Sequence, residues 1–318
     1  MQQILYLRRL RDFGEKISDT FLFLKRNWKK LIGVYAVFVV PFLLIATIVG
    51  AFYADHLYST SLSSAESLRS SDILGPELFI IILCLLMAGS SYNVAVFSYF
   101  RIYEEQKGEQ PTIQQVGQLF VKKFFKAFLY NFLVTILLAI VFILPAIGLA
   151  MIPVLGVVVI FFGFILGGLF AMVLLFYLNC VYVADDYGLS GSISRLFYLL
   201  SNRWWNTIGF TIVVFLIYYV FSAVIQVVAM MVMGISSIGF LTPRTGQSGG
   251  SAHGMISLMA MLIGLMVLVQ QVFYLVVFCG VGVNYYSLAE EKDGSAIEAQ
   301  IDSIGGVSDK YGGIEEQY

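Results

Sequence analysis

The sequence predicts an all-α, polytopic membrane protein with six transmembrane helices, and three observations carry this prediction. Hydrophobic residues make up 59% of the 318-residue chain and charged residues only 12%, against about one half and one quarter in soluble domains. Six apolar runs reach the length of about 20 residues that a helix needs to cross a bilayer. The basic residues are spread very unevenly over the segments that separate these runs.

The six apolar runs are expected to be helices, because a helix satisfies its backbone hydrogen bonds internally, as hydrocarbon demands. Pro153 lies between the third and fourth runs and predicts a tight hairpin there. Pro41 and Pro145 lie inside runs and predict kinks. We expect Gly163 and Gly167 to pack against a neighbouring helix of the same chain. The runs lie at 31–53, 78–100, 127–150, 154–183, 207–235 and 255–286.

The distribution of Lys and Arg predicts the orientation of the six spans. Of the 19 basic residues, only Arg69 and Arg244 lie in the segments 54–77 and 236–254, which share one side of the membrane. All the others lie on the opposite side, and loops rich in Lys and Arg stay in the cytoplasm. With six spans, the N- and C-termini are both expected to be cytoplasmic.

An internal repeat predicts that the chain consists of three pseudo-repeats, each an interfacial amphipathic helix followed by a membrane hairpin. The segments Phe13–Gly33 and Ser190–Gly209 align without a gap, and Ile113–Tyr130 is a weaker third copy. The aligned pairs are Ser18/Ser194, Phe21/Phe197, Leu24/Leu200, Trp28/Trp204, Ile32/Ile208 and Gly33/Gly209.

The three interfacial helices are predicted near residues 12–30, 112–126 and 190–205, at the cytoplasmic face. Ser190 or Ser192 could cap the third, with Asp185 and Asp186 just upstream. In the first, apolar side chains recur every three or four residues, at Phe13, Ile17, Phe21, Leu24, Trp28 and Leu31.

Such a helix lies in the headgroup plane, with Trp at the membrane boundary and its basic side chains near anionic lipid. Short linker helices that pack on the bundle without a lipid preference are the alternative interpretation. The predicted lipid contacts are Trp28, Lys29, Lys30, Lys122, Lys123, Arg203, Trp204 and Trp205.

Two regions follow from this organisation. Residues 1–289 form the membrane domain, and residues 290–318 form an acidic, largely disordered cytoplasmic tail. The tail is expected to stay solvated, with docking on the basic face or binding of a partner as alternatives.

No catalytic, metal-binding or cofactor-binding residue is predicted, because none of the known motifs occurs. The cores of the six runs contain no ionisable side chain of the kind that proton-coupled transporters place at mid-depth. The three cysteines, Cys84, Cys180 and Cys279, lie far apart in apolar runs and are interpreted as packing residues. The chain is therefore not expected to be an enzyme, to need a cofactor or to bind nucleic acid.

Polar amides inside the runs are the remaining candidates for a site. Hydrogen bonding between helices is their first interpretation. A polar seam along which a ligand moves is the second. The seam would consist of Asn93, Asn131, Asn179, Gln226 and Gln270.

Three segments, Arg11–Leu31, Ala184–Trp205 and Asn284–Gly305, carry a resemblance to an uncharacterised family of bacterial six-span membrane proteins. That family is similar to the membrane domain of some glycerophosphoryl diester phosphodiesterases. The resemblance implies a helical bundle in the bacterial inner membrane. The catalytic domain of those enzymes, with its His and acidic metal ligands, has no counterpart in this chain.

Two functions are compatible with these observations. The first is a non-enzymatic membrane protein that organises lipids or scaffolds a membrane or cytoplasmic protein partner through its cytoplasmic helices. The second is a transporter or flippase that moves a lipid or another amphiphile through the polar seam.

Overall fold

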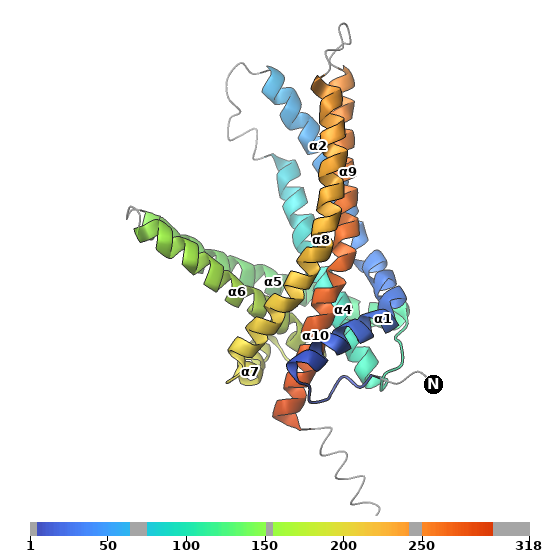
Figure 1. The fold of residues 1–318 in the computed structure, drawn as a ribbon, viewed down its shortest axis with the longest axis vertical. Helices are drawn as coiled ribbons and strands as arrows, with labels where there is room; N and C mark the ends of the chain where they lie inside the picture. Colours follow the sequence, from blue (N-terminus) through green and yellow to red (C-terminus); the bar gives the residue numbers. More distant parts are fainter. Residues whose placement is uncertain (1–4, 64–74, 151–154, 242–249, 295–318) are drawn as a thin grey trace, which may run out of the picture.

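The structure is a computed structural model that describes residues 5–63, 75–150, 155–241 and 250–294. Every regular element in these ranges is an α-helix, which confirms the predicted fold class (Figure 1). The helices are α1 (Phe13–Phe38), α2 (Val40–Ser63), α4 (Pro76–Glu105), α5 (Ile113–Ala150), α6 (Leu155–Ala184), α7 (Leu189–Leu200), α8 (Trp204–Leu241), α9 (Gly250–Phe273) and α10 (Leu275–Asp293).

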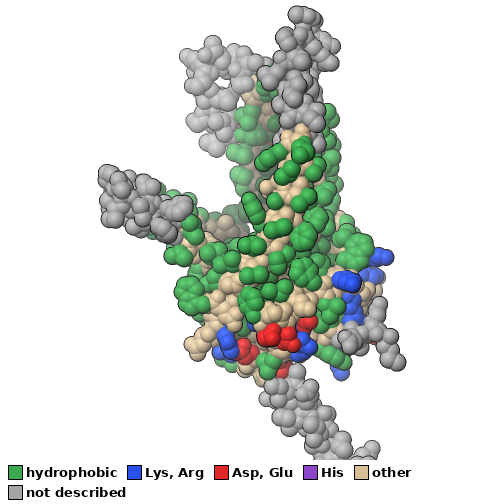
Figure 2. Space-filling view, in the orientation of Figure 1, with side chains coloured by type: hydrophobic (Ala, Val, Ile, Leu, Met, Phe, Trp, Pro, Cys, Tyr) green, Lys and Arg blue, Asp and Glu red, His purple; other side chains and the backbone are tan. Residues whose placement is uncertain are grey.

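Six helical segments in the described part are long and apolar enough to cross a membrane, so the chain is a multi-pass integral membrane protein. On the face that Figure 2 shows, Lys, Arg, Asp and Glu side chains gather towards one end, and hydrophobic side chains predominate elsewhere among the described residues. We call this charged end, where α1, α7 and the end of α10 lie, the base. The spans are Val40–Thr60, Pro76–Glu105, Ile113–Val141, Gly163–Ala184, Trp204–Val228 and Ile256–Asp293.

Helix α10 is the centre of the base. Every residue from Leu275 to Glu290 is buried, and α1, α4, α6 and α8 all pack against it. Two glycines allow this close approach: a Cβ at Gly280 would lie 2.9 Å from Val214 of α8, and a Cβ at Gly282 would lie 2.7 Å from Phe100 of α4. A helix that is apolar all round is stable only when it is enclosed, and here protein encloses it.

The sixth apolar run is one candidate span, Ile256–Asp293, that Tyr274 divides into α9 and α10. Tyrosine hydroxyls satisfy backbone carbonyls near the break: Tyr35 donates to the Leu268 carbonyl at 2.7 Å and Tyr92 to the Gln271 carbonyl at 2.7 Å. These two bonds fasten the junction of α9 and α10 to α1 and α4.

Helix α10 also extends into the predicted acidic tail. Its last turn includes Glu290 to Asp293, and Gly294 ends the helix with a φ of +65°, in the left-handed region that favours glycine. The first four residues of the predicted tail thus belong to the membrane domain. Residues 295–318 lie outside the described ranges.

The first predicted span, 31–53, begins too early in the chain. Helix α1 continues to Phe38 and α2 begins at Val40, and α1 runs obliquely across the base instead of along the spans (Figure 1). Pro41 lies in the first turn of α2, where it lacks the backbone N–H that would continue α1. The proline predicted to kink a span therefore marks the change of helix.

The second predicted interfacial helix, 112–126, is not a separate element but the first part of α5, which continues to Ala150. At 1.5 Å per residue, its 38 residues span roughly 57 Å, far more than the hydrocarbon core of about 30 Å. The third interfacial helix is α7, and a short turn separates it from α8, which starts at Trp204. The three units thus differ at this junction, and the three-repeat arrangement stays a prediction.

Helices α5 and α6 form a pair that diverges from α2, α8 and α9 (Figure 1). They lie side by side, as the predicted hairpin requires, and residues 151–154 between them lie outside the described ranges. A Cβ on Gly163 or Gly168 of α6 would meet no atom within 4 Å. The prediction that the glycine motif packs closely on a neighbouring helix is therefore wrong at Gly163.

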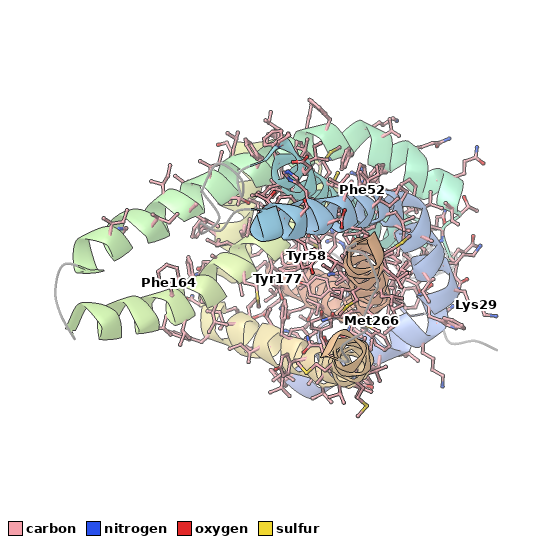
Figure 3. All side chains as sticks on the ribbon, turned by 90° about the horizontal axis from the view of Figure 1, so that it is seen from above. Lys29, Phe52, Tyr58, Phe164, Tyr177 and Met266 are labelled. Atoms are coloured by element: carbon pink, nitrogen blue, oxygen red, sulfur yellow. The ribbon has the colours of Figure 1, made fainter. Side chains whose placement is uncertain are left out.

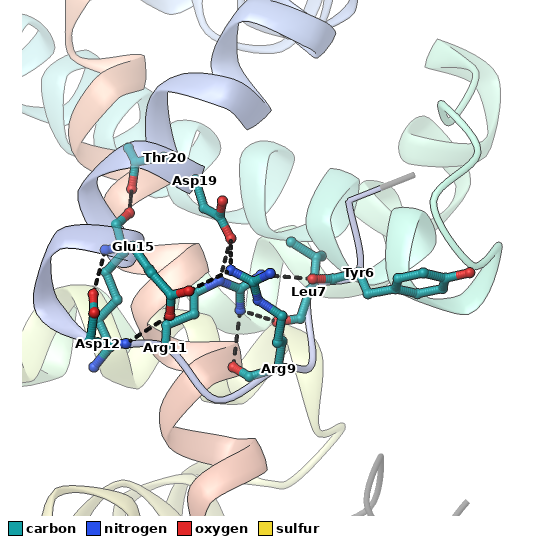
Figure 4. Close-up of polar contacts among 9 residues, drawn as sticks. Tyr6, Leu7, Arg9, Arg11, Asp12, Glu15, Asp19 and Thr20 are labelled. Atoms are coloured by element: carbon teal, nitrogen blue, oxygen red, sulfur yellow. Dashed lines mark hydrogen bonds and ion pairs between the residues drawn. The ribbon is translucent and has the colours of Figure 1, made fainter. Parts of the chain in front are cut away.

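Residues 5–12 form a strap that folds back onto the base (Figure 4). Leu7 is completely buried and so is the Arg11 side chain. The Arg11 guanidinium donates to Asp19 at 2.6 Å, to the Leu7 carbonyl at 2.6 Å and to the Tyr6 carbonyl at 2.7 Å. Asp12 and Glu15 form a capping box that starts α1, so the strap and the helix are joined at one point.

Candidate functional site

Three of the five predicted seam residues come together between α4, α5 and α6. Asn179 donates to the Asn131 side-chain oxygen at 2.8 Å, and Asn131 donates to the Ser90 hydroxyl at 3.2 Å. They line a cavity of about 210 Å³ that Asn93 and Thr135 also border. We call it the amide cavity.

Asn93 is the unsatisfied member of the amide cavity. Its amide nitrogen donates to the Gly89 carbonyl at 2.9 Å, while its side-chain oxygen is buried without a hydrogen-bond partner. A buried acceptor left unpaired costs about 1–3 kcal/mol. The cavity therefore offers an acceptor to any group that brings an N–H or O–H.

The other two seam residues lie elsewhere, so the predicted continuous seam is wrong. Gln270 of α9 donates to the Ser222 hydroxyl and, at 3.3 Å, to the Tyr218 hydroxyl of α8. Gln226 contacts the same Ser222 hydroxyl at 3.5 Å. This second group ties α8 to α9, which is the helix-pairing role that the sequence favoured.

A second cavity, of about 420 Å³, lies at the base beside the same three helices. The side chains around it carry four positive charges and one negative charge. We call it the basic cavity. It is lined by Arg101, Leu119, Lys122, Lys123, Lys126, Tyr130, Tyr182, Asp186, Tyr187 and Gly188.

Lys123 is fixed at the inner wall of the basic cavity. It is only 8% exposed, and its ammonium donates to the Tyr182 carbonyl at 3.1 Å and to Asp186. The same ammonium lies 4.7 Å from the centre of the Tyr182 ring, a cation–π contact. The hydrogen bond from Lys123 holds the pKa of Asp186 below its usual value. The pair is therefore intact at neutral pH and is lost only as the pH falls through that lowered pKa.

The backbone conformation of Asp186 sets the position of its side chain. Its φ of 64° lies in the left-handed region, which Asp tolerates better than most residues. This turn directs the carboxylate towards α5 and also brings it to 3.7 Å from Arg101.

The predicted caps of the third interfacial helix are wrong. Gly188 is the N-cap of α7 and provides no side-chain hydrogen bond. Asp185 instead accepts from the Tyr285 hydroxyl at 2.6 Å and from Arg195 at 3.2 Å. Burial alone would lower the pKa of Arg195, but its hydrogen bond to Asp293 raises that pKa above the usual value. Asp185 and Asp186 thus connect the end of α6 to α5, α7 and α10.

The predicted lipid contacts divide into two groups. Lys123, Arg203 and Trp204 have partners inside the protein: Arg203 donates to Glu291 at 2.7 Å, and Trp204 stacks on Phe170 with ring centres 4.8 Å apart. The others are exposed, and so is Arg203, whose side chain is 44% exposed despite its ion pair. Trp28 is 49% exposed and Trp205 is 82% exposed, and Lys29 points away from the protein, whereas Tyr177 lies in its interior (Figure 3). The members of this second group are Trp28, Lys29, Lys30, Lys122 and Trp205.

Reactive groups are few in the described part of the chain. Within it, no group of three or more His, Cys, Asp or Glu side chains could hold a metal ion. Cys84, Cys180 and Cys279 are free and buried, as expected for packing residues.

The basic cavity was missed at the level of sequence, although two of its lysines were predicted lipid contacts. Lys122 and Lys126 are one helical turn apart and share a face of α5, which their spacing already indicates. Arg101 and Tyr182 come from other helices, and no sequence pattern predicts which faces of α4 and α6 meet α5. The resemblance to phosphodiesterase membrane domains stays a prediction, since no family model, no curated protein and no solved structure matches this chain.

Proposed function

We propose that the chain is a non-enzymatic protein of the bacterial inner membrane that associates with anionic lipids, its base facing the cytoplasm. One observation carries the proposal. Cations without a carboxylate partner among the described residues, including Lys25, Lys29 and Lys30, lie exposed on α1 beside the exposed ring of Trp28, and the ring of Trp205 at the start of α8 is exposed as well. Basic residues attract anionic headgroups and Trp favours the headgroup level.

The orientation of α1 supports this proposal. Phe13, Phe21 and Trp28 face outwards, at 42%, 38% and 49% exposure, whereas Lys16 and Asp19 of the opposite face are buried. An apolar stripe that faces outwards at the end of a membrane protein needs lipid or a second protein to cover it. We assign it to lipid, and a protein partner is the occupant that the experiment would reveal instead.

The test uses the full chain in nanodiscs with equal amounts of phosphatidylglycerol and phosphatidylcholine. We expect native mass spectrometry to find phosphatidylglycerol enriched among the retained lipids, and the enrichment to fall as salt rises, because salt screens exposed charges. Equal retention of both lipids at low salt would contradict lipid association. Recovery of a stoichiometric protein from native membranes, in place of lipid, would assign the stripe to a partner.

A transporter of a lipid or another amphiphile is the second candidate, and the amide cavity favours it. The cavity contains an unpaired acceptor on Asn93 and lies where α5 and α6 diverge from α4. The amide cavity and the basic cavity border the same three helices, at different depths. A polar headgroup would therefore find polar partners at two levels.

The substitution Asn131→Leu distinguishes a transporter from a protein that only associates with lipids. The substitution removes the amide that links Ser90 to Asn179, so we expect a transporter to lose most of its activity in a fluorescent-lipid scrambling assay. Gln270→Leu is the matched control, because it removes a membrane-embedded amide outside the amide cavity. Equal loss in both variants, or no scrambling by the wild-type protein, would exclude transport through this cavity.

A further inference from the structure

We propose that the basic cavity binds the phosphate group of one anionic lipid, whose acyl chains lie along α5. The inference deepens the proposed lipid association and rests on it: it names one site and one headgroup chemistry. Three features of the cavity support it: unpaired charge, preorganised donors and an adjoining apolar surface.

The first feature is the positive charge of the basic cavity that no carboxylate balances. Elsewhere at the base the arginines are paired: Arg195 binds Asp185 and Asp293, and Arg203 binds Glu291. In the basic cavity, Lys122 and Lys126 have no carboxylate within 4.0 Å among the described residues. Positive charge beside a membrane surface attracts an anion more strongly than in bulk water, because the local dielectric is lower.

The second feature is that two of the cations are already held in place by protein groups. Lys123 is held by Asp186 and the Tyr182 carbonyl, and Arg101 is held by Glu105 at 2.8 Å and by the Val183 carbonyl at 3.1 Å. Two of the four cations are therefore fixed before any ligand arrives, which lowers the entropic cost of binding. The cavity volume of about 420 Å³ lies within the roughly 300–1,000 Å³ typical of ligand pockets.

The third feature, an exposed apolar surface beside the cavity, favours a lipid over free phosphate as the ligand. Val121, Phe125 and Leu129 form a ridge on α5 beside Lys122 and Lys126, and they are 76%, 73% and 46% exposed. Such a ridge next to a cationic cavity is covered when the ligand carries hydrocarbon as well as phosphate. Free phosphate would satisfy the cations and leave the ridge uncovered.

The experiment compares two double variants of the full chain in phosphatidylglycerol-containing nanodiscs. Lys122→Gln with Lys126→Gln removes the unpaired cations of the basic cavity. Lys29→Gln with Lys30→Gln is the matched control, because these two exposed lysines lie on α1 and line no part of the cavity. All four side chains are exposed, so both variants are expected to fold, and their melting temperatures check this.

We expect the wild-type protein to retain one phosphatidylglycerol molecule at collision energies that strip the others. The cavity variant should bind it on the order of 25-fold more weakly, at about fivefold per lysine near the membrane surface. The control should lower the overall phosphatidylglycerol enrichment but still retain this one molecule. Equal losses in both variants would overturn the site and leave general lipid association standing. Absence of phosphatidylglycerol enrichment in the wild-type protein would overturn both.

Glycerol 3-phosphate distinguishes the two sources of phosphate. The soluble compound, at millimolar concentration, should displace the retained lipid only weakly. A Phe125→Gln variant should hold the lipid less tightly without changing the affinity for glycerol 3-phosphate. If glycerol 3-phosphate displaces the lipid at equimolar concentration and Phe125→Gln has no effect, the ligand is a soluble phosphate and the lipid assignment is wrong.

Discussion

Replacing Gly282 by alanine is expected to lower the melting temperature of the protein in detergent more than any other single added methyl group in α10. The new Cβ would lie 2.7 Å and 2.8 Å from two ring carbons of Phe100. That ring is only 1% exposed and is stacked on Phe23, with ring centres 4.3 Å apart. Because the ring cannot swing away, we expect a loss of about 1–3 kcal/mol in the free energy of unfolding.

Gly209→Ala provides the matched control, since a Cβ at Gly209 of α8 would meet no atom within 4 Å. Alanine favours a helix over glycine by about 1 kcal/mol, so the control should be neutral or stabilising. Phe100→Leu tests the cause: it should cost less in the Gly282→Ala background than in the wild-type protein. Additive effects of the two substitutions would show that Phe100 is not the obstacle.

Arg11→Ala is expected to destabilise the protein by about 3–5 kcal/mol, because it leaves the buried Asp19 carboxylate with only the half-exposed Arg9, at 3.4 Å, as a cationic partner. The guanidinium also satisfies the carbonyls of Tyr6 and Leu7, so the strap should detach from the base. Burial lowers the pKa of Arg11, and the hydrogen bond to Asp19 opposes that effect. Thermal unfolding and limited proteolysis within residues 5–12 would measure both consequences.

Arg9→Ala is the control for Arg11. Arg9 contacts the same Asp19 at 3.4 Å, but its side chain is 49% exposed, and exposed ion pairs contribute about 0–1 kcal/mol. Replacing Arg11 by Met together with Asp19→Leu should recover part of the loss, because no buried charge is left unpaired. If Arg11→Ala were as mild as Arg9→Ala, the strap would not depend on this ion pair.

The spans and the charged end could be predicted because each depends on local composition. A helix needs about 20 apolar residues to cross the bilayer, and one-sided Lys and Arg follow from the positive-inside rule. The central place of α10 could not be predicted. Residues 275–286 are as apolar as a lipid-facing helix, and lipid and protein interiors are equally favourable surroundings for such side chains. The close neighbours of Gly280 and Gly282, and the hydrogen bond from Asn284 to Tyr177, show that protein surrounds these residues.

The site was predictable in part, for a similar reason. An amide in an apolar run needs a partner, so Asn93, Asn131 and Asn179 were identifiable as candidates one by one. Which amides meet depends on helix packing, and Gln226 and Gln270 meet Ser222 of α8 instead. The buried ion pair between Arg11 and Asp19 had no sequence signal, because charged residues of a basic amphipathic segment normally face water.

The enclosed position of α10 has a consequence for the biogenesis of the protein. Translation produces α1, α4, α6 and α8 before it produces α10, so the four helices that pack against α10 are synthesised before the helix that they enclose. Until residues 275–293 emerge from the ribosome, the inner surfaces of these helices, including Phe100 and Val214, face lipid or one another. Packing of the base is therefore completed only with α10, the last of the described helices to be synthesised.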